Sequence, residues 1–160
     1  MSKVQIYTEG SARGNPDGPG GYGTVLHFTD SKGQLHEKTM SGGYVRTTNN
    51  RMELMAAIVG LEALNRPCEV QLYSDSKYLT DAFNQRWIDS WIAKGWNRGK
   101  SGPAKNIDLL KSLLKAKEPH RAEFIWVKGQ AGHPPNERCD QLPTSPADGR
   151  GLMIDVGLEN

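Results

Sequence analysis

Apolar and polar positions alternate along KVQIYTE (residues 3–9), close to the N-terminus. This alternation, with β-branched and aromatic side chains, predicts a β-strand. Similar composition predicts strands over 21–28 (GYGTVLHF) and 34–45 (QLHEKTMSGGYV). The segments between them, 10–21 and 29–33, are rich in Gly, Pro, Asn and Asp, which predicts a loop and a turn. Three strands joined by such short connections predict an antiparallel meander.

A helical pattern follows at residues 47–67 (TTNNRMELMAAIVGLEALNRP). Thr47 to Asn50 offer side chains that can cap the helix N-terminus, and Pro67 lies just beyond its expected end. Apolar residues keep helical spacing through the segment, at Met52, Met55, Ala56, Val59 and Leu64.

The second half of the chain alternates between strand and helix patterns. A buried type of strand is predicted at 69–76, and a last strand at 122–129; helices are predicted at 77–85, 86–97 and 105–117. A meander followed by strands that arrive through helices predicts an α/β fold with a mixed sheet. We expect a single domain over 1–160, in which the residues after about 148 form a loose C-terminal tail.

Composition places the chain among ordinary soluble globular proteins, with 36% hydrophobic and 24% charged residues. No apolar run approaches the roughly 20 residues that a membrane helix needs. The N-terminus lacks the apolar stretch of a signal peptide, so we expect a cytoplasmic protein. Cys68 and Cys139 form no metal-binding pattern, and we interpret them as small buried hydrophobic residues.

The net charge of +2 is unevenly distributed. Residues 86–117 hold eight basic and two acidic residues, so this segment carries about +6 and the remainder about −4. A basic segment of this kind favours a partner rich in phosphate. A solvated helical face would explain the same charges.

Four carboxylates stand out by position: Glu9 and Asp75 at the predicted ends of two strands, Glu53 early in the long helix, and Asp140 after the last strand. If the two strands are neighbours, Glu9 and Asp75 project from the same sheet edge, where Glu53 can reach them. Carboxylates so close raise one another's pKa unless a cation lies between them. Mg²⁺, a hard cation with oxygen ligands, suits such a site. A single Asp or Glu at such a position is more commonly a surface charge or a helix-end residue.

The segments TTNNRMELMAAIVGLEAL, YSDSKYL, WIDSWIAKGW, KNIDLL and WVKGQAGHPPNERCDQL resemble, in this order, those of bacterial type 1 ribonuclease H. The resemblance covers about residues 3–142. It implies a five-stranded mixed sheet with helices on both faces, and Mg²⁺-dependent hydrolysis of the RNA strand of an RNA–DNA hybrid. A transposase or junction resolvase of related fold would show a different motif order.

The resemblance implies that the family's metal-binding carboxylates are Glu9, Glu53, Asp75 and Asp140, and that Gln130 stands at its general acid/base position. Two of these residues depart from the family, which has aspartate in place of Glu9 and histidine in place of Gln130. The longer Glu9 side chain disturbs a bridging Mg²⁺ ligand, and Mn²⁺ is the expected substitute ion. Gln130 cannot shuttle a proton near pH 7.

These departures predict an endonuclease of weakened activity, with a non-catalytic hybrid-binding domain as the alternative. A third departure follows Asp140, where Pro143 and Pro146 replace the family's alanine-rich helix. Proline inside a helix costs about 3 kcal/mol or more, so the helix carrying Asp140 is expected to end near Leu142.

The resemblance also implies which residues hold the hybrid. Minor-groove contacts are expected from Asn15, Asn49, Asn50 and Lys77, and a DNA phosphate contact from Thr48 near a helix start. Thr48, Asn49 and Asn50 are equally explained as helix caps.

The region 87–105 matches the family's basic handle, which cradles the DNA strand. Its expected contacts come from Trp91, Lys94, Trp96, Arg98 and Lys100. Tryptophans at this spacing also suit a hydrophobic core. The expected partner is an RNA–DNA hybrid, with no membrane involved, and the chain is expected to be a monomer.

Overall fold

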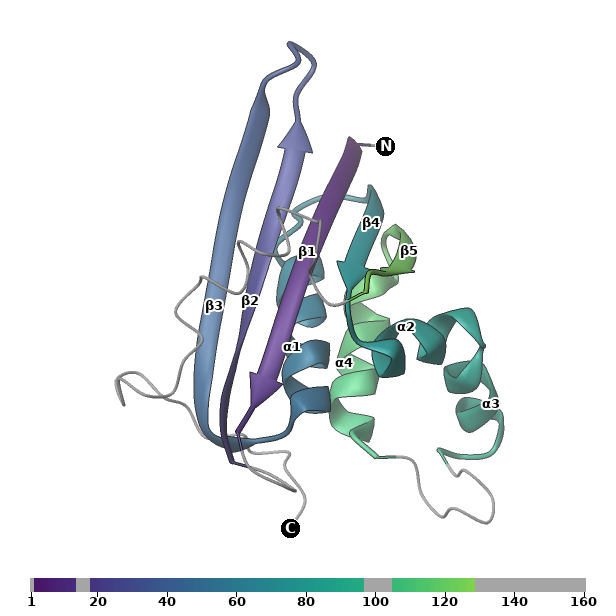
Figure 1. Cartoon of the computed structure of the whole chain (residues 1–160). Helices are drawn as coiled ribbons and strands as arrows, with labels where there is room; N and C mark the ends of the chain where they lie inside the picture. The colour runs from purple at the N-terminus through teal and green to yellow at the C-terminus, as the bar shows by residue number, and fades with distance from the viewer. Residues whose placement is uncertain (1, 14–17, 97–104, 129–160) are drawn as a thin grey trace.

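The computed structural model of the chain describes residues 2–13, 18–96 and 105–128. It contains a five-stranded sheet in the order β3-β2-β1-β4-β5 (Figure 1). The first three strands form the predicted antiparallel meander, whereas β4 pairs in parallel with β1, and β5 in parallel with β4. The predicted mixed sheet is confirmed. The strands are β1 (Ser2–Ala12), β2 (Gly18–Thr29), β3 (Leu35–Thr47), β4 (Cys68–Ser74) and β5 (Arg121–Trp126).

The helices described are α1 (Asn49–Glu62), α2 (Lys77–Asn84), α3 (Trp87–Ala93) and α4 (Ile107–Lys117). α1 and α4 lie side by side against the sheet, and α2 and α3 extend beyond them at the β5 side (Figure 1). Leu79 of α2, Ile88 of α3 and Leu110 of α4 join one core cluster with residues of α1 and the sheet. A helix on the opposite face is not among the described elements and stays a prediction. None of the described helices is long and apolar enough to cross a membrane.

α1 packs against both the sheet and α4. Most of its residues are buried, because β1 and β2 cover one side and α4 another. Leu54 and Leu61 of α1 are almost completely excluded from solvent, as is Ile6 of β1. Burial of each such side chain contributes about 1.5–3 kcal/mol relative to leaving it exposed. The packing holds the first turns of α1 against the C-terminal part of β1, where Gly10 faces Met52 and Glu53.

β1 is longer than its sequence pattern predicts. The alternation predicts an end at Glu9, but Gly10, Ser11 and Ala12 continue the ladder opposite residues 20–22 of β2. Residues at both ends of the predicted glycine-rich loop, 10–12 and 18–21, thus belong to β1 and β2. Glu9 consequently lies within a paired strand, which restricts its backbone more than a position in a loop would.

Two helices end several residues before their predicted C-terminal ends. α1 ends at Glu62, so Leu64 follows the helix instead of extending its apolar face. α3 ends at Ala93, because Gly95 and Trp96 have φ values of +66° and +63°, in the left-handed region. Trp96 therefore lies outside the helix in which the pattern placed it.

Candidate metal centre and nucleic-acid interface

Three acidic side chains converge where β1 and β4 run side by side. The parallel pairing of these strands continues to Tyr7 opposite Tyr73, so Glu9 and Asp75 each lie two residues further along neighbouring chains. Glu53 approaches from the second turn of α1. One ligand oxygen from each of the three carboxylates lies within 4.8 Å of the others. The predicted convergence of these three residues is therefore observed.

The close approach of α1 to β1 depends on Gly10. A Cβ atom at this position would collide with the backbone of Met52 and Glu53. The Gly10 N–H also donates a hydrogen bond to the Glu53 carboxylate. Gly10 lies within β1 and not in a turn, and the absence of a side chain there lets the helix approach the strand.

The turn after β4 is held by its own hydroxyl groups. Ser74 Oγ donates to Glu53 Oε2 at 3.5 Å, and the Ser76 N–H donates to Ser74 Oγ at 3.0 Å. The Ser76 hydroxyl caps α2 by accepting the Leu79 N–H at 3.1 Å. Asp75 lies between these two serines, so the network orients the residue that carries the second carboxylate.

Glu53 is the buried member of the cluster, with 7% of its surface exposed. Burial raises its pKa well above the usual range, and the negative charges of Asp75 and Glu9 raise this pKa further. A divalent cation between the three carboxylates would offset both the cost of burying the Glu53 charge and its repulsion by Asp75 and Glu9. The donors are all carboxylate oxygens, which hard ions such as Mg²⁺ and Mn²⁺ prefer, so the residues fit a metal site.

The carboxylates open into a surface hollow. Its described lining also includes Asn49, Asn50 and Lys77, three residues that the resemblance assigns to the hybrid. The side chains of Asn50 and Lys77 are exposed, so they are available to a ligand in the hollow.

Thr48 and Asn49 have structural roles at the start of α1. Thr48 is the N-cap, and its hydroxyl oxygen accepts the Arg51 N–H at 3.2 Å. The side-chain oxygen of Asn49 accepts a hydrogen bond from the Ala12 N–H at the end of β1. The capping interpretation is confirmed for Thr48, while nucleic-acid contacts by Thr48, Asn49 and Asn50 stay predictions.

The tryptophans of the handle pack toward the protein. Trp91 and Trp96 are partly buried against the main core, in agreement with the packing alternative. Trp87, in contrast, is 40% exposed, and its ring centroid lies 6.3 Å from that of Trp91. Lys94 is exposed, as a phosphate contact requires. Asn15, Arg98, Lys100, Gln130 and Asp140 lie outside the described residues, as does Cys139.

Sequence reasoning missed two groups close to this site. Arg51, next to the catalytic candidates on α1, is buried and forms two hydrogen bonds with the Asp108 carboxylate of α4. Trp126, at the end of β5, contacts both Asp75 and Lys77. Both residues stand within segments that carry the family resemblance, but their partners lie 49 to 57 positions away in the chain.

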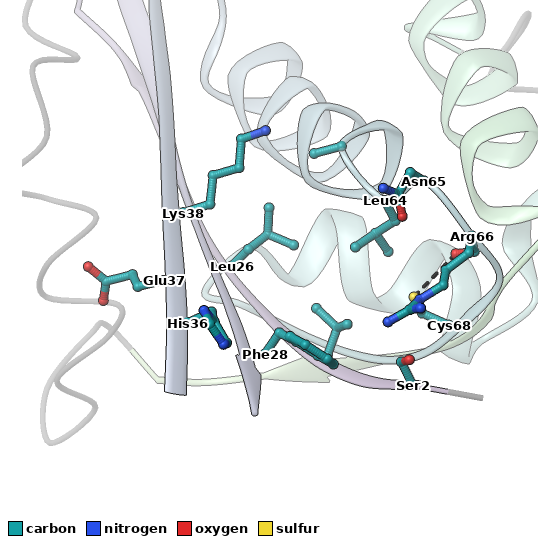
Figure 2. Close-up of a pocket in the computed structure, with 12 residues that line it drawn as sticks. Ser2, Leu26, Phe28, His36, Glu37, Lys38, Leu64, Asn65, Arg66 and Cys68 are labelled. Atoms are coloured by element: carbon teal, nitrogen blue, oxygen red, sulfur yellow. Dashed lines mark hydrogen bonds between the residues drawn. The ribbon is translucent and has the colours of Figure 1, made fainter. Parts of the chain in front are cut away.

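An apolar cavity of about 320 Å³ lies far from the carboxylates, between the C-terminal end of α1 and strands β1–β3. Figure 2 shows Leu26, Phe28 and Leu64 around this cavity, and Glu37 directed away from it. Its lining contains none of the three clustered carboxylates, so it is not the candidate centre. Cys68 at its edge is buried, as expected, and its thiol donates to the Arg66 carbonyl.

Comparisons with known proteins agree with the geometry. The chain matches the family model for RNase H over residues 1–147. It is 65% identical over 157 residues to a ribonuclease H of Lachnoclostridium phytofermentans, covering 98% of this chain and 99% of the relative. A ribonuclease H of Desulforamulus reducens is 51% identical over 156 residues, covering 98% and 94%.

Solved structures show the same fold. LC9-RNase H1, described as a type 1 RNase H with the type 2 active-site motif, superposes with a TM-score of 0.81 at 31% identity. The match covers 97% of this chain and 78% of that one. A foamy viral protease-reverse transcriptase in complex with RNA/DNA hybrid has a TM-score of 0.69 at 17% identity, over 88% of this chain and 19% of that one, which supports the fold alone. The chain belongs to the ribonuclease H family.

Proposed function

We propose that this protein is an endonuclease that hydrolyses the RNA strand of RNA–DNA hybrids with the help of divalent metal ions and leaves 5′-phosphate ends. The convergence of Glu9, Glu53 and Asp75, with ligand oxygens within 4.8 Å, is the observation that carries the proposal. The names of the relatives support the substrate class.

In this proposal Glu9, Glu53, Asp75 and Asp140 hold two ions, with Mg²⁺ as the natural choice. Two bound ions supply an activated water and stabilise the leaving oxygen of the phosphodiester. Buried Glu53 is a fixed ligand, since the Gly10 N–H and the Ser74 hydroxyl both bond its carboxylate. Glu9 and Asp75 are partly exposed and face the side from which substrate arrives.

Substrate selection requires recognition of the RNA 2′-hydroxyl, which both donates and accepts hydrogen bonds. Asn49, Asn50 and Lys77 lie on the rim of the carboxylate hollow, and Asn15 completes the proposed minor-groove contacts. The handle, through Lys94, Arg98 and Lys100, neutralises phosphates of the DNA strand. Binding carried by such contacts weakens steeply as salt rises.

Two residues reduce the proposed rate. Glu9 places its carboxylate about 1.5 Å further from the backbone than the family's aspartate does, the length of one C–C bond. Gln130 cannot titrate, and loss of general acid/base help costs on the order of 10²–10⁴ in rate. Mn²⁺ is the ion we expect to tolerate the altered geometry better. The active-site motif of LC9-RNase H1 shows that this motif varies among type 1 folds.

The test is cleavage of an end-labelled RNA–DNA hybrid in Mg²⁺ and in Mn²⁺, by the unsubstituted chain, Glu9→Asp, Gln130→His and the double variant. We expect slow cutting that rises when aspartate is restored and rises again with histidine. Glu53→Gln is the inactive control, because it removes the buried ligand. Hybrid binding without cutting by any version in either ion would refute the enzyme and identify a hybrid-binding domain instead.

A further inference from the structure

Trp126 contacts the carboxylate centre although its own side chain is neither acidic nor basic. It is the last residue of β5 and pairs with Ser74 at the end of β4. Its indole N–H donates to the Asp75 carbonyl at 3.1 Å, and the Lys77 ammonium lies 4.7 Å from the centre of its ring. One side chain thus contacts two residues of the hollow.

The hydrogen bond acts on the turn that carries Asp75. On one side of this residue, Ser74 is held by the sheet and by the Val127 N–H, which donates to the Ser74 carbonyl at 2.9 Å. On the other side, Ser76 begins α2 as its cap. The indole bond acts on the peptide between these anchors, so it restricts the rotation that would swing the Asp75 carboxylate away from Glu9 and Glu53.

The aromatic face acts on Lys77. Lysine has a long flexible side chain, and its ammonium is attracted to the face of a tryptophan ring. Lys77 is the one cationic residue among the described residues that line the hollow. Contact with Trp126 therefore holds a positive charge beside three carboxylates, at the rim of the hollow in which we propose that the hybrid binds.

We propose that Trp126 is a positioning residue of the metal centre: its indole N–H orients Asp75 for metal binding, and its ring holds Lys77 in place at the rim of the hollow for contact with the hybrid. This inference rests on the proposed function and deepens it. Trp126 takes no part in proton transfer or metal ligation through either contact. Its loss should therefore weaken binding of the metal ion and of the hybrid without abolishing the chemistry.

Three substitutions separate the two contacts. Trp126→Phe keeps an aromatic face but removes the N–H, whereas Trp126→Leu removes both. Lys77→Met removes the ammonium and leaves the indole bond intact. Lys32→Met, at an exposed lysine in the turn between β2 and β3, is the matched control for loss of one positive charge.

Mn²⁺ binding is measured by calorimetry without substrate, and hybrid binding by fluorescence anisotropy in EDTA. We expect Trp126→Phe to lower Mn²⁺ affinity about three- to tenfold, the range for one lost hydrogen bond, with hybrid affinity changed less than twofold. Lys77→Met lowers hybrid affinity and raises KM about two- to fivefold with kcat nearly constant. Lys77→Met has a smaller effect on hybrid affinity in the Trp126→Leu background than in the unsubstituted chain.

Unchanged Mn²⁺ affinity in a folded Trp126→Phe variant would overturn the role of the indole N–H. Strict additivity of Lys77→Met and Trp126→Leu in hybrid binding would overturn the role of the ring. A loss of thermal stability alone, with unchanged affinities for Mn²⁺ and for the hybrid, would show that Trp126 only stabilises the fold. If the proposed function is wrong, neither the unsubstituted chain nor Glu9→Asp cleaves the hybrid. The measurements of Mn²⁺ affinity and hybrid affinity still test the role of Trp126 in that case.

Discussion

Asp108→Asn tests the ion pair that links α4 to the helix carrying Glu53. The Arg51 guanidinium donates to both oxygens of Asp108, at 2.9 and 2.6 Å, and its Nη1 lies 3.4 Å from Asn106 Oδ1. The Arg51 side chain is only 2% exposed, whereas that of Asp108 is 47% exposed. The substitution thus removes a negative charge from a buried positive one while keeping the shape of the side chain.

The expected loss follows from this asymmetric burial. Removing one partner of a fully buried pair costs about 3–5 kcal/mol. Because water reaches the Asp108 side and the asparagine oxygen still accepts one bond, we expect about 1–3 kcal/mol of unfolding free energy. In a chain of this size each kcal/mol lowers Tm by about 2–4 °C.

The stabilisation that Asp108 provides depends on pH. The Arg51 hydrogen bonds and charge hold the pKa of Asp108 below its usual range. A carboxyl group whose pKa is lowered by folding stabilises the protein above its unfolded pKa of about 3.9, and this contribution is lost as pH falls through the folded value. The stability difference between the unsubstituted chain and Asp108→Asn is therefore full at pH 7 and shrinks below about pH 4.

Urea unfolding at pH 7, 5 and 3, followed by circular dichroism, measures this difference. Asp89→Asn is the matched control, because Asp89 also lies in the first turn of a helix and is exposed. We expect the control to change stability by less than about 0.5 kcal/mol. A loss at pH 7 for Asp108→Asn as small as the control's, or one that does not shrink in acid, would refute the reasoning.

Three further predictions follow from individual contacts. Gly10→Ala places a methyl group against the backbone of Met52 and Glu53, so it should destabilise the fold by about 1–3 kcal/mol and weaken Mn²⁺ binding, measured by melting and calorimetry. Thr48→Ala removes the N-cap of α1 and should cost about 0.5–2 kcal/mol in urea unfolding, whereas Thr48→Ser should restore most of it. Burial raises the pKa of the Cys68 thiol, so in a Cys139→Ala background this thiol should react with a disulfide reagent only after unfolding; rapid native labelling would contradict its burial.

Much of the fold can be predicted from local sequence patterns. The meander, α1 and its cap, and β4 each depend on residues adjacent in the chain, such as Thr48 beside the first turn of α1. The boundaries are less predictable because they depend on pairing. β1 extends past Glu9 only because Gly20 and Gly21 of β2 lie opposite its last residues, which no property of β1 alone reveals.

The sequence by itself determined the family resemblance, the order of strands and helices along the chain, and the identity of the carboxylates in β1, directly after β4 and on α1. Only the tertiary structure decided that Glu9, Glu53 and Asp75 meet, that Gly10 allows this meeting, and that Trp126 and Arg51 support it. The physical reason is separation along the chain. Hydrophobic period and capping act over a few residues, whereas the bonds from Trp126 to Asp75 and from Arg51 to Asp108 form only once packing has brought distant segments together.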